Sequence, residues 1–361
     1  MTTLEKQGQI KTSAEHLHDS TSDLHSLKRQ SWLARSVGAV AIGRNEGERL
    51  TRCLQSLVQK VGTVVYVDSG STDDSVSLAR SMGVHVVELD MSIPFTAARA
   101  RNEGIAALKT VQPLAEFAQV VDGDCAVVDG WLDDAFDAMH KNSQLAIVSG
   151  RRRERFPKTS KYNLLCDMEW AGPTGLISYC GGDALIRLHA FNEVGGYDAS
   201  LIAGEEPEMC VRLRQREWRI LRLDRDITWH DASMTKFSQF WKRAIRSGHA
   251  YAEGYALHGK STESFRRKEV RSIAFWAGVF PVAMIALAWP TFGASLIVLQ
   301  AGLGRLARKI AKGREAFGDS KQDASLYGKY VVLGKFAQLQ GMLQFKVRTL
   351  LRRKPKLIEY K

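Results

Sequence analysis

The chain has 361 residues, of which 45% are apolar, and its formal net charge is +12. This length allows two domains or one large domain with appendages, and the basic excess favours an anionic partner: nucleic acid, acidic lipid or a phosphorylated substrate. The five cysteines include no CxxC pair, which argues against a disulfide framework or a zinc site and fits a reducing compartment.

The beginning of the chain is polar and has no apolar core, so we expect a flexible polar tail over residues 1–35. It resembles neither a secretory signal nor a membrane anchor. His16, His18 and His25 have metal-binding chemistry, but a solvated tail accounts for them more simply.

From Val37 onward, strand and helix patterns alternate. Buried runs predict four strands, at residues 36–43, 63–67, 84–89 and 118–124. Helical spacing predicts three helices between them, at residues 48–60, 73–83 and 96–108. This alternation predicts parallel β-α-β units with right-handed crossovers, in which ligands bind beyond the carboxyl ends of the strands.

The fourth predicted strand ends in VVDGDC, which places Asp122 and Asp124 either side of one glycine. Two convergent carboxylates repel each other unless a cation lies between them, and a hard divalent ion is the usual one. Asp-Gly-Asp is also good turn chemistry, but its place at a strand end favours a binding site. The strands carry no GxGxxG or Walker sequence, which excludes a nicotinamide enzyme and a P-loop ATPase.

The second half contains an amphipathic helix, GEEPEMCVRLRQREWRI, with Glu205 and Glu206 in its first turn. Carboxylates there suit the positive end of the helix dipole, with or without a further role. His230 emerges from a later apolar stretch, where a packed structural role explains it nearly as well as a ligand role. RRRER (Arg151 to Arg155) lacks interleaved aromatic residues, so we expect a solvated loop or a phosphate contact and no nucleic-acid partner.

Residues 273–303 carry no charge. This uncharged run is too long for one membrane span and too short for two. Pro290 lies near the middle and both flanks are basic, which by the positive-inside tendency puts both ends in the cytoplasm. We therefore expect a hairpin, re-entrant or barely crossing, at the cytoplasmic face of the inner (plasma) membrane. A buried helical hairpin inside a soluble oligomer is the alternative, and the sequence leaves a homo-oligomer open.

The last helical pattern has an apolar face and a basic end, which indicates an interfacial helix that contacts anionic membrane lipid. Its apolar members are Val332, Phe336, Leu339, Leu343, Val347 and Leu350. The chain is thus divided into a tail (1–35), an α/β domain (36–258) and a membrane-associated helical region (259–361).

Seven motifs in order resemble the family 2 glycosyltransferases over about Val37 to His258. They are VAIGRNEGERL, VVYVDSGSTDDS, ARARNEGI, VVDGDC, CGGDALIRLHAFNEVGGYD, GEEPEMCVRLR and FWKRAIRSG. The resemblance implies the GT-A fold, a Rossmann-like mixed and mostly parallel α/β sheet flanked by helices, here with a C-terminal hydrophobic helical region for membrane association.

The resemblance also implies the ligands of the site. Residues that would contact the nucleotide-sugar donor are Arg44, Glu46, Asp68, Arg101, Asp122 and Arg243. Asp124 would hold Mg²⁺ or Mn²⁺ against the diphosphate, with Asp122 and His230 as further metal-side residues. FWKRAIRSG matches its family motif poorly, so its helix could equally present Lys242, Arg243 and Arg246 to lipid phosphate.

The catalytic base implied by the resemblance is Glu206, with Glu205 second, although the family usually has Glu-Asp at this place. The implied activity is an inverting, metal-dependent transfer of a sugar, most simply from a UDP-sugar. The acceptor would be a hydroxyl of a membrane-borne, polyprenyl-linked saccharide in polysaccharide or exopolysaccharide synthesis. Two alternatives remain: a sugar nucleotidyltransferase, and a catalytically inactive membrane scaffold of the same fold.

Overall fold

The computed structural model of the protein describes residues 31–352, and its first part is a nine-stranded sheet. The strands are β1 (Val37–Gly43), β2 (Val64–Asp68), β3 (His85–Glu88), β4 (Phe117–Asp122), β5 (Cys125–Val127), β6 (Leu145–Glu154), β7 (Gly175–Ile177), β8 (Ala184–Arg187) and β9 (Arg219–His230). Their order is β3-β2-β1-β4-β8-β6-β9-β5, with β7 beside β9.

The strands predicted from the sequence, β1 to β4, pair in parallel, as do β6 and β9. The remaining pairs are antiparallel. Strand β8 pairs with β4 and with β6, and β9 pairs with β5 and with β7. The predicted mixed α/β sheet with flanking helices is confirmed. β5, β7 and β8 have three or four residues each, which is too short for a period to be read from sequence.

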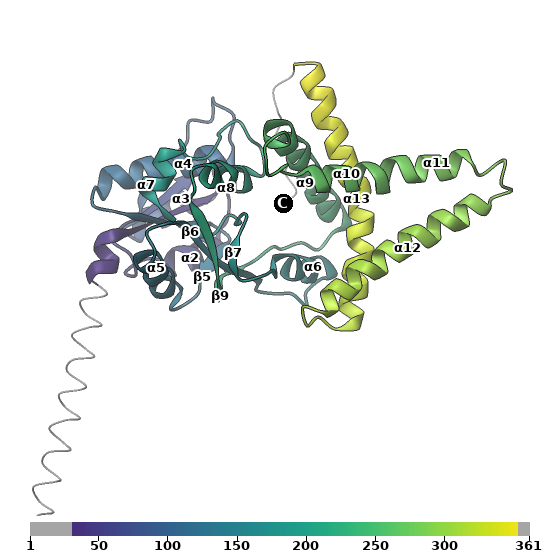
Figure 1. Cartoon of the computed structure of the whole chain (residues 1–361). Helices are drawn as coiled ribbons and strands as arrows, with labels where there is room; N and C mark the ends of the chain where they lie inside the picture. Colours follow the sequence, from purple (N-terminus) through teal and green to yellow (C-terminus); the bar gives the residue numbers. More distant parts are fainter. Residues whose placement is uncertain (1–30, 353–361) are drawn as a thin grey trace, which may run out of the picture.

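Two apolar cores lie on opposite faces of this sheet (Figure 1). One face is covered by α2 (Glu48–Gln55), α3 (Ser75–Ser81) and α5 (Trp131–Lys141). The other is covered by α4 (Ala97–Val111), α7 (Leu188–Glu193) and α8 (Glu205–Gln215). Because both faces are covered, β1 and β2 are buried along almost their whole length, which explains their continuous apolar sequences.

Helix α4 lies unusually close to the sheet. A Cβ atom at Gly104 would approach Val40 Cγ1 to 2.3 Å, so only glycine fits where the helix crosses β1. Thr96 caps the helix by accepting a hydrogen bond from the backbone N–H of Arg99. This close packing fixes Arg101, one turn before Gly104, near the carboxyl ends of the parallel strands.

The remaining helices form a second layer beside the sheet (Figure 1). They are α6 (Lys161–Trp170), α9 (Phe237–His258), α10 (Arg267–Ile273), the π-helix η1 (Ala274–Val279), α11 (Phe280–Ala286), α12 (Ala294–Glu315) and α13 (Lys321–Leu350). The chain turns at residues 287–293, around Pro290, so that α10–η1–α11 and α12 form a projecting hairpin. By length and composition, one helical segment among residues 31–352, Arg267–Ala286, could cross a membrane.

The structure shows which elements lie at the two predicted domain boundaries. Residues 31–36 are helical and Leu33 is buried in the core, so the folded chain begins before the predicted end of the tail at 35. Residues 1–30, with His16, His18 and His25, lie outside the described residues. The boundary at 258 coincides with the last residue of α9, a helix that packs along α13 of the C-terminal region.

The α9–α13 contact depends on glycines, and this gives a first prediction. A Cβ atom at Gly341 of α13 would lie 2.0 Å from the carbonyl oxygen of Ile245 in α9. We expect Gly341→Ala to lower the free energy of unfolding by about 1–3 kcal/mol, because the helices must move apart. Chemical denaturation in detergent measures this change.

Gly313→Ala in α12 is the matched control, because a Cβ atom there meets nothing within 4 Å. Its better helix propensity should raise stability by up to about 1 kcal/mol. Equal effects of the two substitutions would contradict the close packing of α9 on α13.

Candidate active site

A cavity of about 450 Å³ opens at the carboxyl ends of β1 and β4. Predicted site residues that line it are Arg44, Glu46, Arg101, Asp122, Asp124, Glu205, Glu206, His230 and Arg243. They come from strand ends, from α4, from the first turn of α8 and from α9. Residues nearly two hundred positions apart therefore converge on one cavity, as the strand-end rule predicts.

Asp68 is the predicted site residue that does not line the cavity, although its neighbour Ser69 does. Its carboxylate is buried and accepts hydrogen bonds from Tyr66 Oη, from Ser71 Oγ and from the backbone N–H groups of Gly70 and Ser71. In this structure it fixes the turn after β2. A contact with nucleotide stays a prediction.

Arg101 forms ion pairs with three carboxylates. Its Nη1 lies 2.7 Å from Glu205 Oε1 and 3.1 Å from Glu206 Oε1, and its Nη2 lies 2.7 Å from Asp122 Oδ1. The Arg101 side chain is only 3% exposed. A buried charge is tolerated only when it is paired and hydrogen-bonded, so Arg101 ties the end of β4 to the start of α8.

The two glutamates of α8 differ in exposure. The Glu205 side chain is 4% exposed, whereas that of Glu206 is 15% exposed. Burial, and then the negative charge of Glu205, raise the pKa of Glu206 to about 7 although Arg101 opposes the shift. A carboxyl that titrates near neutral pH at the rim of a cavity suits a general base, which favours Glu206 over Glu205.

Arg152 and Asp183 also belong to the site, and the sequence analysis did not assign them. Arg152 lies in β6 and lines the cavity, so the expectation that RRRER forms a solvated loop is wrong. Its Nη2 lies 2.8 Å from Asp183 Oδ1 and 3.0 Å from Asp122 Oδ2. The apolar run LAIVSG before RRRER was the available signal, since it indicates a strand whose carboxyl end carries the arginines.

Asp122 is thus held by Arg101 on one oxygen and by Arg152 on the other. Burial alone would raise the pKa of Asp122, but the two guanidinium groups outweigh it and hold that pKa well below its usual range. Asp122 is therefore ionised and oriented by arginine. Its predicted place beside a metal stays a prediction.

Asp124 and His230 form the pair best placed to hold a divalent cation. Asp124 Oδ2 and His230 Nε2 lie 3.2 Å apart, and both side chains are nearly buried. Two ligands of one ion lie at such a separation when each bond is about 2.1 Å long. The backbone causes this closeness, because Cys125, next to Asp124, is directly paired with His230 in the sheet.

The surroundings of His230 also fit metal binding. Its Nδ1 lies 3.4 Å from Glu154 Oε2, the arrangement in which a carboxylate orients a ligand imidazole. Burial lowers the pKa of His230, with Glu154 opposing and Arg152 reinforcing the shift. The imidazole is therefore neutral at pH 7, the form that binds metal.

Arg44, Glu46 and Arg243 complete the walls. Glu46 pairs with Arg49 at 2.8 Å, while Arg243 pairs with the partly exposed Glu169 across the gap between α9 and α6. Their predicted contacts with a nucleotide-sugar stay predictions, since they follow from position in the motifs.

The geometry brings acids, arginines and the Asp124–His230 pair together at one cavity. Residues 40–191 match the family model described as Glycosyl transferase family 2. The chain carries a family 2 glycosyltransferase domain. Such an enzyme acts on nucleotide-sugar donors, and the predicted resemblance is confirmed. Glu205, Glu206, His230 and Arg243 lie beyond the matched residues.

Two relatives agree with this family. The chain is 24% identical over 261 residues to succinoglycan biosynthesis protein ExoA of Rhizobium meliloti, covering 66% of this chain and 77% of the relative. It is 28% identical over 201 residues to a pre-mycofactocin glycosyltransferase of Mycobacterium tuberculosis, covering 50% of this chain and 39% of the relative.

Among solved structures, the mannosyltransferase PcManGT from Pyrobaculum calidifontis, in complex with GDP-Man and Mn²⁺, has a similar fold. The TM-score is 0.52 at 17% identity, covering 95% of this chain and 99% of that one. This likeness extends over the sheet and the C-terminal helices and supports the GT-A fold.

The Arg152–Asp183 pair gives the second prediction. The Asp183 side chain is 1% exposed, so Arg152→Ala leaves a buried carboxylate without its main counter-charge. We expect a loss of about 3–5 kcal/mol in the free energy of unfolding, measured by denaturant titration.

Arg225→Ala serves as the control, since its pair with Asp134 is 58% and 40% exposed. That substitution should cost less than about 1 kcal/mol. A loss of similar size in both variants would show that Arg152 is not a structural counter-charge.

Proposed function

We propose that the protein is an inverting glycosyltransferase that moves a sugar from a nucleoside-diphosphate donor, most simply a UDP-sugar, to a hydroxyl of a membrane-borne, polyprenyl-linked saccharide. The observation that carries this proposal is one cavity that joins a metal-binding pair, Asp124 and His230, to a rim glutamate, Glu206. Asp124 and His230 supply the site for a cation, and Glu206 supplies a base.

The charges around the cavity suit the departure of a nucleoside diphosphate. A divalent cation, when bound, would stabilise the negative charge that develops on the leaving diphosphate. Asp124 and His230 would hold it, while Arg44 and Arg243 offer further positive charge from the walls. Arg101 and Arg152 keep Asp122 ionised and fixed at the donor side.

One carboxylate suits the role of base, and this supports an inverting mechanism. Arg101 contacts Glu205, Glu206 and Asp122, but the Glu206 side chain is 15% exposed whereas that of Glu205 is 4% exposed. Glu206 would take the proton of the acceptor hydroxyl as that oxygen attacks the anomeric carbon opposite the leaving group. A single displacement of this kind inverts the anomeric centre.

The donor set favours Mn²⁺ over Mg²⁺. Mg²⁺ is a hard ion that takes oxygen ligands, whereas the pair at this site offers one imidazole nitrogen. PcManGT, whose structure contains Mn²⁺, is consistent with this choice.

The third prediction tests the base and the metal pair together. Glu206→Gln should leave Mn²⁺-dependent donor binding unchanged and lower turnover by about 10²–10⁴-fold, because the amide cannot accept the proton. In the wild type, activity should fall as the pH drops below about 7, the pKa of Glu206. A screen of nucleotide-sugars, with release of the nucleoside diphosphate as readout, measures the turnover of the variant and the pH dependence of the wild type.

Asp124→Asn is the matched variant for the metal. It should abolish the Mn²⁺ effect on donor affinity while leaving Glu206 in place. Full turnover by Glu206→Gln would remove the base assignment, and release of pyrophosphate would indicate a nucleotidyltransferase instead.

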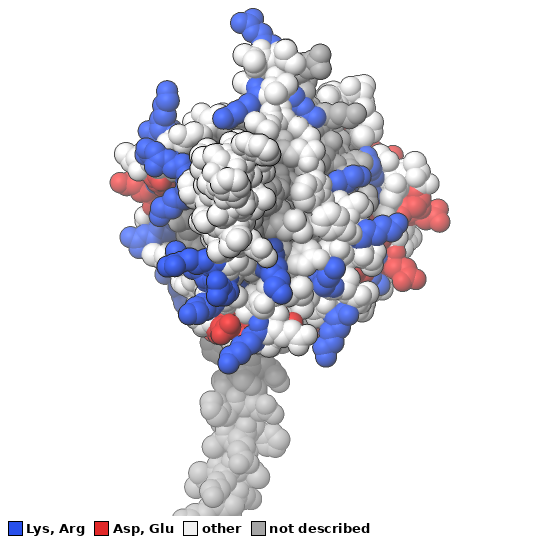
Figure 2. All heavy atoms as spheres, turned by 90° about the vertical axis from the view of Figure 1, so that its right-hand side faces the viewer, with Lys and Arg blue, Asp and Glu red and all other residues white. Residues whose placement is uncertain are grey.

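Membrane association forms part of the proposal, at the cytoplasmic face of the inner membrane. The hairpin exposes large apolar side chains, with Trp289 92% and Phe292 101% exposed at its turn. Figure 2 shows this apolar projection with Lys and Arg side chains gathered around it. Exposed basic residues at its base are Arg267, Lys268, Arg271, Arg305, Arg308 and Lys309. Apolar tip and basic base together suit insertion into an anionic bilayer.

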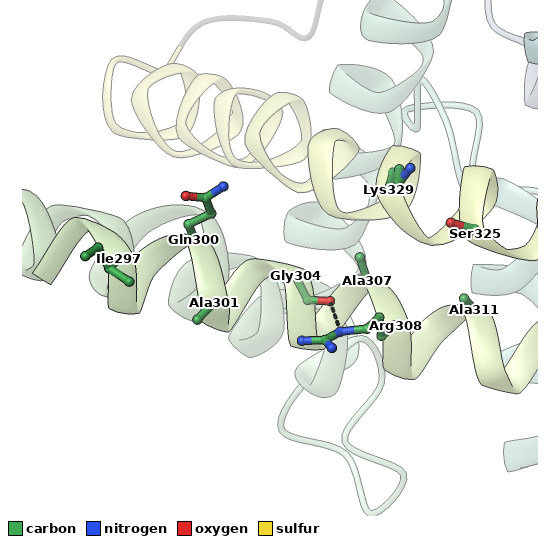
Figure 3. Close-up of a pocket in the computed structure, with 9 residues that line it drawn as sticks. All are labelled: Ile297, Gln300, Ala301, Gly304, Ala307, Arg308, Ala311, Ser325 and Lys329. Carbon is green, nitrogen blue, oxygen red and sulfur yellow. Dashed lines mark hydrogen bonds between the residues drawn. The ribbon is translucent and has the colours of Figure 1, made fainter. Parts of the chain in front are cut away.

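Two surface grooves extend the apolar face. One, of about 550 Å³, lies between α12 and α13, where Gly304 and Ala307 face Ser325 and Lys329 (Figure 3). The other lies along the exposed side of α13, beside Leu343 and Val347. Val332 of the predicted interfacial face is instead buried, so α13 offers its apolar stripe to lipid only toward its end. The relative named for succinoglycan biosynthesis supports a polysaccharide acceptor.

The fourth prediction concerns this insertion. Trp289→Glu with Phe292→Glu should release the protein from anionic vesicles, since a charge at the inserted tip costs roughly 2–3 kcal/mol per residue. Co-sedimentation after a carbonate wash measures retention. Leu114→Glu, at a side chain 62% exposed on the far domain, is the control and should stay bound. Release of wild type by salt alone would exclude insertion.

A further inference from the structure

The carboxylate of Glu154 faces the ring nitrogen of His230 that Asp124 does not contact. Glu154 is the last residue of β6 and is paired directly with His230 of β9 in the sheet. Its side chain is fully buried, and its Oε2 lies 3.4 Å from Nδ1 of His230. A carboxylate only accepts hydrogen bonds, so Nδ1 carries the proton of the neutral imidazole. Nε2, which faces Asp124, then keeps the electron pair that binds a metal.

Within the part of the chain that the structure describes, Glu154 pairs with no lysine or arginine, and its other hydrogen bonds come from neutral N–H groups. Its Oε1 accepts from the backbone N–H of Phe156 at 3.1 Å and from Asn163 Nδ2 at 3.2 Å. Its Oε2 accepts from the backbone N–H of Ala232 at 3.0 Å. A buried carboxylate is costly unless a positive charge balances it. A cation bound to Nε2 of His230 would supply that charge through the imidazole.

Asn163 holds both Glu154 and the segment that follows His230. It lies in the first turn of α6 and is 1% exposed. Its Nδ2 donates to Glu154 Oε1 and to the carbonyl oxygen of Phe156, and its Oδ1 accepts from the backbone N–H of Met234 at 3.0 Å. One amide side chain therefore ties the end of β6 to the residues after β9.

Helix α6 also contacts His230 from its other end. The ring of Trp170, the last residue of α6, lies 4.9 Å from the ring of His230 at an interplanar angle of 83°. This edge-to-face contact favours one orientation of the imidazole. At the start of the helix, the side chain of Ser160 caps α6 by accepting from the backbone N–H of Asn163. The helix thus supports His230 directly through Trp170 and indirectly through Asn163 and Glu154.

We propose that Glu154 and Asn163 are positioning residues for the cation held by Asp124 and His230. Asn163 holds Glu154, and Glu154 holds the imidazole with Nε2 directed at Asp124. Neither Glu154 nor Asn163 lines the cavity, so both would act on the cation through His230. This inference rests on the proposed function, because that function supplies the cation, and it adds two residues that lie outside the cavity wall.

The test measures the binding of Mn²⁺ alone to the full chain in detergent, with no donor or acceptor present. Electron paramagnetic resonance follows the free ion, and nitrogen modulation of the spin echo reports an imidazole ligand on the bound ion. The wild type should show this nitrogen signal, and His230→Ala should lose it. Glu154→Gln should weaken Mn²⁺ affinity about 10–100-fold and reduce the signal, because its amide turns N–H groups toward other donors.

Asn163→Leu tests the second residue. Leucine has a similar volume but no amide, so the carboxylate of Glu154 stays while its support from α6 is lost. Mn²⁺ affinity should fall about tenfold, at the lower end of the range for residues that orient a ligand. Circular dichroism checks the fold of each variant, and Asn163→Leu carries the test if Glu154→Gln does not fold.

Asp167→Asn is the matched control for a loss of stability. Asp167 accepts from the backbone N–H of Glu154 and pairs with Arg151 and Arg153, but it does not contact the Glu154 carboxylate. The substitution should lower the unfolding midpoint in EDTA, because it removes the charge from both ion pairs. Mn²⁺ affinity and the nitrogen signal should stay as in the wild type.

Two results would overturn the inference. One is unchanged Mn²⁺ affinity in both Glu154→Gln and Asn163→Leu, beside a wild type that binds the ion. The other is an equal loss of affinity in Asp167→Asn, which would show that these residues only support the fold. Absence of Mn²⁺ binding in the wild type would instead refute the cation site of the proposed function, so the two failures are distinguishable.

Discussion

The ion cluster around Arg101 is the interaction on which the site depends. One guanidinium, almost fully buried, contacts Asp122 at the end of β4 and both glutamates at the start of α8. These carboxylates would repel one another without it. Burial, and then the charge of Glu205, raise the pKa of Glu206 to about 7, and Arg101 opposes that shift. A single buried cation therefore holds together the wall of the cavity and the residue proposed as its base.

The two aspartates beside this cluster have different partners. Arg152 pairs with the second oxygen of Asp122, so both oxygens of that carboxylate contact arginine. Asp124, two residues later, faces His230, because the short strand β5 pairs with the end of β9. Two aspartates of one motif thus acquire different roles through their neighbours rather than through their own chemistry.

Helix α9 links this chemistry to the C-terminal helices. One of its faces lines the cavity, while another packs on α13 so closely that Gly248 and Gly341 have no room for a side chain. The hairpin begins after the loop at residues 259–266. Helix α9 and the residues that follow it therefore connect the wall of the cavity to the hairpin.

The sequence by itself determined the elements whose signals are local. Apolar periodicity indicated β1 to β4 and the helices between them, an uncharged run indicated the hairpin, and the motifs placed Asp122, Asp124 and the α8 glutamates at strand and helix ends. Only the tertiary structure decided that Arg152 is a partner of Asp122, that His230 faces Asp124, and that Asp68 fixes its own turn. Those contacts join residues far apart in the chain, or depend on burial, and neither spacing nor composition encodes a distance across a sheet.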